Sequence, residues 1–229
     1  MLLDYIQQRQ QMLEESGDFY TPAGIQVFSK DPLIDDSVDM DAVVAKFESL
    51  LPDHIRDEVE MIIVGHFDEF DERGINAFYK DGTLHVTNFQ SDNDDLLDDL
   101  VHETAHSLEE AHGHFIYGDQ KLKNEFLRKR EHLYNILWKM GFKAPQDMFR
   151  DTEYDQEFDE FLHQDVGYDK LSGVLKGVFV TPYAATSLRE YFATAFTEFY
   201  LYPDSHGYIS KVSPELYKKL VQLHKMDEA

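Results

Sequence analysis

The segment from Val101 to His106, with the sequence Val-His-Glu-Thr-Ala-His, constrains this chain more than any other feature. His102 and His106 are four residues apart, so both imidazole rings lie on one face if the segment is an α-helix. Glu103 stands beside the first of them. Two imidazoles at this spacing, next to a carboxylate that can accept a proton, indicate a metal-binding helix.

The residues before this segment predict a β-hairpin that leads into the same helix. Residues 74–87 contain two short strand patterns around Asp81-Gly82, a pair typical of tight hairpin turns. Ser91 or Asp92 can then cap the helix, whose first turns are acidic, as the helix dipole favours. The apolar side of the helix consists of Leu96, Leu97, Leu100, Val101, Ala105 and Leu108. A hairpin followed by a buried helix with two histidines is the arrangement that zinc peptidases use.

A hydrolytic zinc site needs three protein ligands and an open position for water, so a third ligand must come from elsewhere. His112 follows His106 by six residues, which is the spacing of metzincins. However, Glu109 occupies the position where metzincins have a glycine that lets the chain leave the helix. Residues 107–111 favour a helix, which is therefore expected to continue to Gly113 as its C-terminal cap and to point His112 away from the metal.

A second candidate for the third ligand lies far downstream, in residues 181–196. This stretch resembles the metal-binding helix of the anthrax lethal factor catalytic domain and of the related Pro-Pro endopeptidases. Those proteins carry a tyrosine seven residues before a zinc-binding glutamate, which opens a Glu-aromatic-Phe-Ala helix. Tyr183 and Glu190 have this separation, and the resemblance extends over roughly residues 37–225.

The resemblance implies a gluzincin, a zinc peptidase with two histidines and one glutamate as metal ligands. The implied site residues are His102, His106 and Glu190 as zinc ligands, Glu103 as the general base, and Tyr183 beside the reacting carbonyl. One position departs from the family pattern, because Thr194 stands where lethal factor has a second glutamate. A hydrogen bond that supports a ligand is therefore expected to be weaker, or to come from Glu198 or another residue.

The composition limits the kinds of partner that this chain is expected to bind. The net charge of −24 argues against a nucleic-acid ligand, because phosphate binding depends on basic clusters, and it would instead attract basic substrates or a cationic partner. Without cysteine the chain has neither disulfides nor thiolate metal sites. No signal peptide and no membrane-spanning stretch are predicted, so no membrane partner is expected. The expected location is cytoplasmic at synthesis, unless the chain is a processed form or is exported by another route.

The chain is predicted to contain an N-terminal arm, residues 1–36, and one catalytic domain, residues 37–229. The arm consists of a helix over residues 2–14 and an irregular segment over residues 17–32. The domain is predicted as α+β and zincin-like, mainly helical with a small mixed sheet beside the histidine helix. Its other expected elements are a helix capped by Asp36 or Ser37 and ending near Leu51, a strand over residues 59–64, a helix over residues 119–140 with a basic middle, and a helix starting at residues 213–215.

Three functional hypotheses follow from these features. The first is a zinc endopeptidase acting on peptide or protein substrates, which would align as an extended chain along an unpaired edge of the strand from Gly82 to Thr87. The second is a structural component of a larger assembly, contacting partners through the N-terminal helix or the acidic surface. The third is a metzincin that uses His112. Intact Glu103 and Tyr183 favour an enzyme, because a structural zinc site needs neither a base nor an oxyanion donor.

Overall fold

The computed structural model of the protein describes residues 18–35 and 37–226. The predicted helix over residues 2–14 and the proposed cap Asp36 lie outside the described residues. The chain forms two units, residues 1–108 and residues 109–229. The division falls inside one long helix, and each unit is described by itself.

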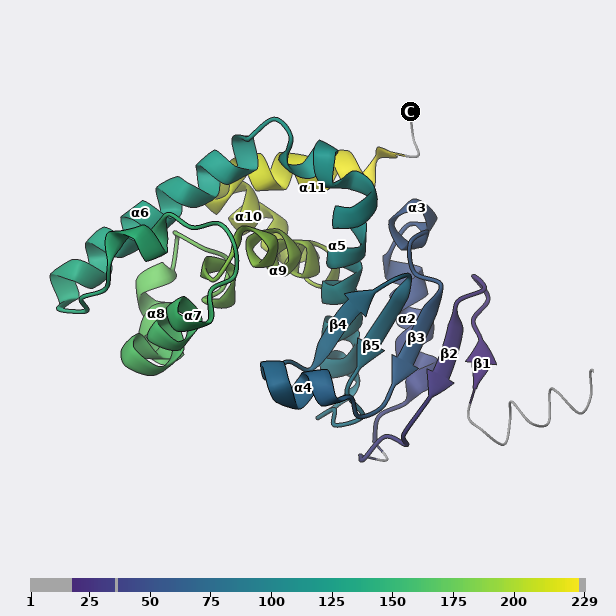
Figure 1. Ribbon diagram of the computed structural model, residues 1–229. Coiled ribbons are helices and arrows are strands. Elements are labelled where there is room, and N and C mark those ends of the chain that lie inside the picture. The colour runs from purple at the N-terminus through teal and green to yellow at the C-terminus, as the bar shows by residue number, and fades with distance from the viewer. Residues whose placement is uncertain (1–17, 36, 227–229) are drawn as a thin grey trace, which may run out of the picture. The chain divides into compact units, whose positions relative to one another are not determined.

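The first unit contains a mixed sheet of five strands with the order β1-β2-β3-β5-β4 (Figure 1). The strands are β1 (Phe19–Tyr20), β2 (Gln26–Ser29), β3 (Met61–Val64), β4 (Ala77–Lys80) and β5 (Thr83–Val86). The inner strands β2, β3 and β5 are parallel, whereas β1 and β4 run antiparallel to their neighbours. The predicted small mixed sheet is therefore present.

The helix α2 (Met40–Leu50) buries one face, formed by Val43, Val44 and Phe47, and lies behind the sheet in Figure 1. Its N-cap is Asp39, which accepts a hydrogen bond from the backbone of Ala42 at 3.0 Å, so the predicted helix is confirmed with a start a few residues later than expected. Two short helices complete this unit around the sheet, α3 (Asp53–Arg56) and α4 (Asp68–Arg73).

The hairpin β4–β5 is confirmed, with Asp81 and Gly82 forming its turn at φ values of 48° and 78°. Backbones with positive φ at both turn positions match the twist of the two strands, and glycine and aspartate tolerate this conformation. The expectation of an unpaired edge at residues 82–87 is wrong, because β5 is hydrogen-bonded to β3 on one side and to β4 on the other. The outermost strand on this side of the sheet is β4.

The expectation of an irregular segment over residues 17–32 is also wrong. β2 is an inner strand that pairs with β1 and β3, and of its four residues Val27 alone is fully buried. A strand this short has no clear alternation of its own. It is specified by hydrogen bonds to β3, about 35 residues further along the chain.

The histidine helix α5 (Asn93–Tyr117) is longer than expected. Asp92 caps it as predicted, since its carboxylate accepts hydrogen bonds from the backbone of Asp94 and Asp95 at 2.9 Å each. The expected end at Gly113 is wrong, because the helix continues through this glycine for another turn. Glycine weakens a helix interior by only about 1 kcal/mol, which packing of neighbouring residues can offset.

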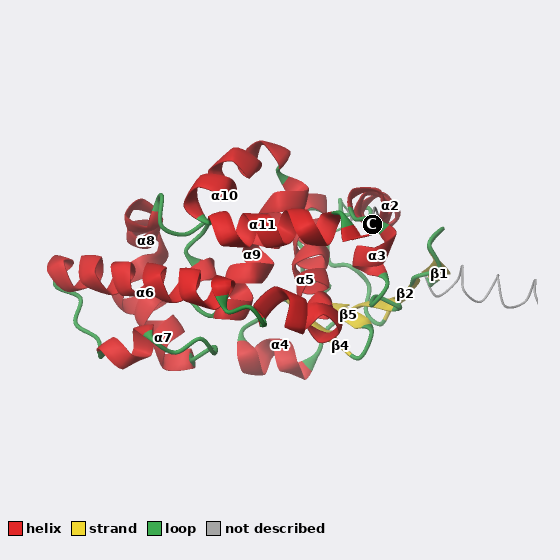
Figure 2. Ribbon diagram, turned by 90° about the horizontal axis from the view of Figure 1, so that it is seen from above, coloured by secondary structure: helices red, strands yellow, loops and turns green. Residues whose placement is uncertain are grey.

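The second unit is helical and contains none of the five strands of the sheet (Figure 2). Its long helices are α6 (Lys121–Met140), α9 (Leu188–Leu201) and α11 (Pro214–His224). Its shorter elements are η1 (Gln146–Phe149), α7 (Gln156–Glu160), η2 (Phe161–Gly167), α8 (Tyr168–Leu175), η3 (Tyr183–Ala185), η4 (Pro203–Ser205) and α10 (His206–Val212). The predicted helices at residues 119–140 and 213–215 correspond to α6 and α11. The basic middle of α6 is only partly at the surface, because Lys129 and Arg130 are buried.

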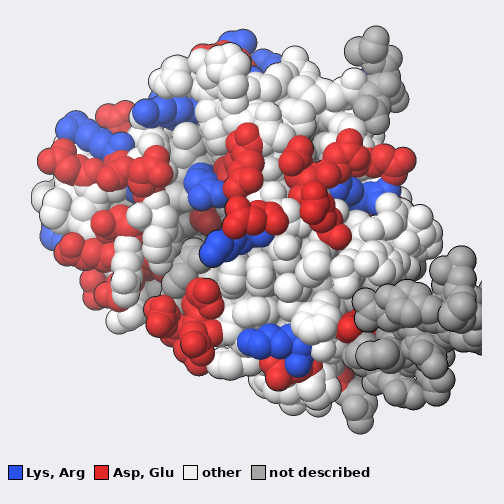
Figure 3. Space-filling view, turned by 45° about the vertical axis from the view of Figure 1, so that its right-hand side comes forward, with Lys and Arg blue, Asp and Glu red and all other residues white. Residues whose placement is uncertain are grey.

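The sequence has 45 acidic and 21 basic residues, and Figure 3 shows several acidic groups on one face. Among the described residues, no helix is both long enough and apolar enough to cross a membrane. The chain as a whole is an α+β protein with a predominance of helix.

Candidate metal centre

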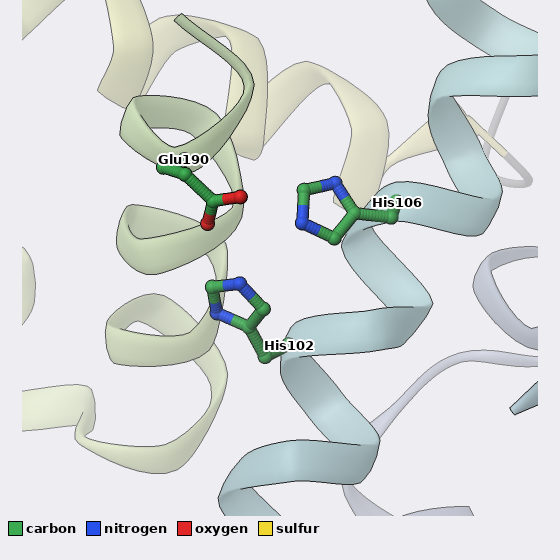
Figure 4. A group of neighbouring side chains, drawn as sticks. All are labelled: His102, His106 and Glu190. Atoms are coloured by element: carbon green, nitrogen blue, oxygen red, sulfur yellow. The ribbon is translucent and has the colours of Figure 1, made fainter. Parts of the chain in front are cut away.

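His102, His106 and Glu190 form a group in which one potential ligand atom of each residue lies within 4.8 Å of those of the other two (Figure 4). The two imidazoles extend from α5 and the carboxylate extends from the first turn of α9 toward them. Two imidazoles and a carboxylate are ligands that divalent transition metals accept. Within the described part of the chain, this is the group of histidine and acidic side chains that meets the spacing for a metal ion.

The histidine pair owes its geometry to the helical period. The ring centroids of His102 and His106 are 5.1 Å apart with an angle of 73° between the rings, as expected for positions one turn apart on one face. The opposite face of α5 consists mainly of apolar residues. The two polar residues on it, Thr104 and Ser107, are buried, and their hydroxyls donate hydrogen bonds to backbone carbonyls one turn earlier, at 2.8 Å each. The helix can therefore be buried on one side while it presents both imidazoles on the other.

Glu190 is held by the start of α9. Ser187 is the N-cap of this helix, and its hydroxyl accepts a hydrogen bond from the backbone N–H of Glu190 at 3.0 Å. The carboxylate thus lies in the first turn, where the positive end of the helix dipole stabilises a negative charge. The local sequence from Ser187 to Glu190 is that of a capping box, which explains why the helix begins here.

Glu109, the residue that replaces the metzincin glycine, binds the start of α9. Its side chain is 8% exposed and accepts a hydrogen bond from Nε of Arg189 at 2.6 Å. The hydroxyl of Tyr117 donates to the same carboxylate, and the Tyr117 ring packs edge-on against Phe192 of α9. Arg189 precedes Glu190, and Glu109 lies one turn after His106 on α5. These contacts fix the first turn of α9 against the end of α5.

Tyr183 lies in the short helix η3, immediately before α9. Burial raises the pKa of its hydroxyl above the usual value, and the negative charge of Glu190 acts in the same direction. The hydroxyl therefore remains protonated at neutral pH and can donate a hydrogen bond. Glu190 is one of the charges that act on this hydroxyl, so Tyr183 lies in the surroundings of Glu190.

Glu103 is 7% exposed and lies on α5 beside the histidine pair, but it is not a member of the ligand group. Its neighbour Asp99, one turn earlier, has a pKa that burial raises to about 7. Glu103 therefore lies largely shielded from solvent, next to His102.

The alternative ligands do not join the group. His112 is six residues beyond His106 on the same uninterrupted helix, which turns its side chain roughly 240° around the axis. Glu198 lies two turns beyond Glu190 on α9 and is not part of the group either. Thr194 is 8% exposed, and its hydroxyl has no hydrogen-bond partner among the described residues, so within these residues it supplies no supporting hydrogen bond to the group.

Sequence reasoning did not find Arg189 as a residue of this site. The sequence feature that could have indicated Arg189 is its partner Glu109, which was considered only as a departure from the metzincin pattern. Comparisons with family models, curated proteins and solved structures gave no match for this chain. Its function must therefore be inferred from the chemistry of the side chains.

Proposed function

We propose that this protein is a zinc-dependent endopeptidase with a zincin-like fold. The observation that carries the proposal is the third ligand: Glu190 lies with His102 and His106 although 83 residues of the chain, residues 107–189, separate it from His106. Two histidines and a glutamate are a ligand set of hydrolytic zinc sites, which keep one position open for water.

The donor atoms fit zinc. Bonds of about 2.0 to 2.2 Å to a tetrahedral ion require ligand atoms roughly 3.3 to 3.6 Å apart. Atoms that already lie within 4.8 Å reach this spacing through small side-chain rotations. The remaining residues, Glu103 and Tyr183, then supply functions that a structural site would not need.

A bound zinc ion would lower the pKa of a water molecule toward neutrality and polarise the carbonyl of the substrate. Glu103 takes the proton from the attacking water and later delivers it to the departing amine. Tyr183 donates a hydrogen bond to the carbonyl oxygen as negative charge develops there. Both residues act on the reacting atoms, so changing them affects turnover more than metal binding.

Peptides suit this site better than small molecules. The outermost strand β4 has one edge that is not paired within the sheet, and an extended peptide can add to such an edge through main-chain hydrogen bonds. The net charge of −24 favours basic substrates by long-range attraction. We therefore propose a protein or peptide substrate with basic residues near the cleaved bond.

Profiling cleavage of a peptide library by the zinc-loaded protein tests this proposal. We expect reproducible cuts that disappear when a chelator removes the metal, with basic residues enriched around them. A zinc-loaded protein that cleaves no peptide in broad libraries would instead support a structural component of a larger assembly.

Metal titrations separate the ligand candidates. Glu190→Ala is expected to lower the affinity for zinc strongly, because one of three protein ligands is lost. His112→Ala is expected to leave the affinity unchanged, because this side chain points elsewhere on α5. A competition assay with a chromophoric chelator measures both variants. The opposite pattern would support a metzincin.

Tyr183→Phe is expected to lower the catalytic rate by roughly 10- to 1000-fold, because one hydrogen bond to the developing oxyanion is lost. The metal content should not change. The rate of cleavage of a peptide selected from the library measures the effect. Tyr208→Phe serves as the control, since its hydroxyl accepts a hydrogen bond from the backbone of Gly177 and donates one to the carbonyl of Phe179. Equal rate losses in the two variants would contradict the assigned role.

A further inference from the structure

Arg130, in the middle of α6, is 1% exposed. Its guanidinium lies over the ring of Phe158 at 3.7 Å. Burial of a charged group is costly unless hydrogen bonds replace the lost water. The groups that receive these hydrogen bonds therefore indicate what the residue holds in place.

The guanidinium binds four backbone carbonyls from two segments. One terminal nitrogen donates to Ala185 and, at 3.1 Å, to Thr186. The other donates to Met148 at 2.6 Å and to Asp151 at 3.4 Å. Within the described residues Nε has no partner, so the hydrogen bonds of this side chain all go to these two segments. Only the planar fork of arginine can bind both segments in this way.

The first of these segments joins the two residues of the proposed site that belong to the second unit. Ala185 and Thr186 lie between Tyr183 and the N-cap of α9, which holds Glu190. The residues that follow these two segments are also linked, because the backbone N–H of Leu188 donates to the carbonyl of Thr152 at 2.8 Å. A shift of this turn would move the phenol and the carboxylate together.

We infer that Arg130 is a positioning residue for the metal centre, an inference that rests on the proposed function. It acts through the turn at residues 183–187 and fixes the position of the Tyr183 hydroxyl relative to the Glu190 carboxylate. Groups that orient metal ligands commonly contribute about 10- to 100-fold to metal affinity or activity.

Arg130→Lys tests this role, because it keeps the positive charge and removes the fork. We expect the affinity for zinc to fall by about 10- to 100-fold. The melting temperature is measured alongside to record any loss of stability. Arg130→Gln is the second variant if the lysine variant does not fold, since its amide can still donate to one of the two segments.

The neighbouring residue Lys129 provides a matched control. It is 9% exposed, and its ammonium group donates to the carbonyls of Val178 and, at 2.7 Å, Val212, which lie outside the turn at residues 183–187. Lys129→Met removes buried hydrogen bonds from the same helix. It is expected to lower the melting temperature and to leave the affinity for zinc unchanged.

A double-mutant cycle adds a second readout. If Arg130 acts on turnover through Tyr183, then Arg130→Lys should lower kcat much less in a Tyr183→Phe background than in the wild type. Additive effects on kcat would refute the link between Arg130 and Tyr183.

The outcomes separate this inference from the proposed function. Unchanged zinc affinity in Arg130→Lys, or equal losses in Arg130→Lys and Lys129→Met, would overturn the positioning role while the function stands. A wild type that binds zinc without hydrolysing peptides would refute the function, and the affinity measurements would still decide the role of Arg130. A wild type that binds no zinc would refute both.

Discussion

Glu103→Gln is expected to lower the rate of peptide hydrolysis by roughly 100- to 10,000-fold and to leave the zinc content unchanged. Glutamine has the shape of glutamate but its amide cannot accept the proton of the attacking water. Metal binding should persist, because Glu103 is not a member of the ligand group. The rate on a selected peptide and the metal content by elemental analysis measure the two effects.

Glu110→Gln is the control for this substitution, because Glu110 is an exposed glutamate on the same helix. It should cleave the peptide at the wild-type rate. Wild-type turnover in Glu103→Gln would refute the proposed mechanism. Loss of zinc from this variant would show that the carboxylate holds the metal rather than the proton.

His102→Ala and His106→Ala are each expected to remove the bound zinc, since two remaining protein ligands hold the ion poorly. Hydrolysis should be lost with the metal. Elemental analysis after dialysis against a dilute chelator measures the zinc content of both variants against the wild type.

His114→Ala is the matched control, because this exposed histidine lies on the same helix and outside the ligand group. It should retain one zinc per chain. Full retention of zinc in both His102→Ala and His106→Ala would reject the assignment of the metal centre.

Local sequence patterns predicted the helix ends, the turn and the buried helix face that neighbouring residues specify. The cap at Asp92, the helix start at residues 213–215, the Asp81-Gly82 turn and the apolar side of α5 follow from neighbouring residues. Such features depend on backbone conformation and helical period, which a few consecutive residues determine. These parts of the fold were found from the sequence.

The errors concern residues whose conformation depends on distant partners. β2 has one buried residue, Val27, and forms its hydrogen bonds with β1 and β3, so its own sequence did not indicate a strand. The same limit applies to β5, whose hairpin was predicted but whose pairing with β3 was not. Strand neighbours are set by packing of the whole sheet.

The sequence by itself determined the histidine helix, because a spacing of four residues places two imidazoles and an adjacent glutamate in a known relation on any α-helix. The resemblance to lethal factor supplied Glu190 and Tyr183 as expectations. Only the tertiary structure brought Glu190 to His102 and His106, since no local rule fixes the distance between groups so far apart in the chain. The same holds for Arg130, one of the basic residues in the middle of α6, because only the tertiary structure shows that it is buried and bonded to the turn at residues 183–187.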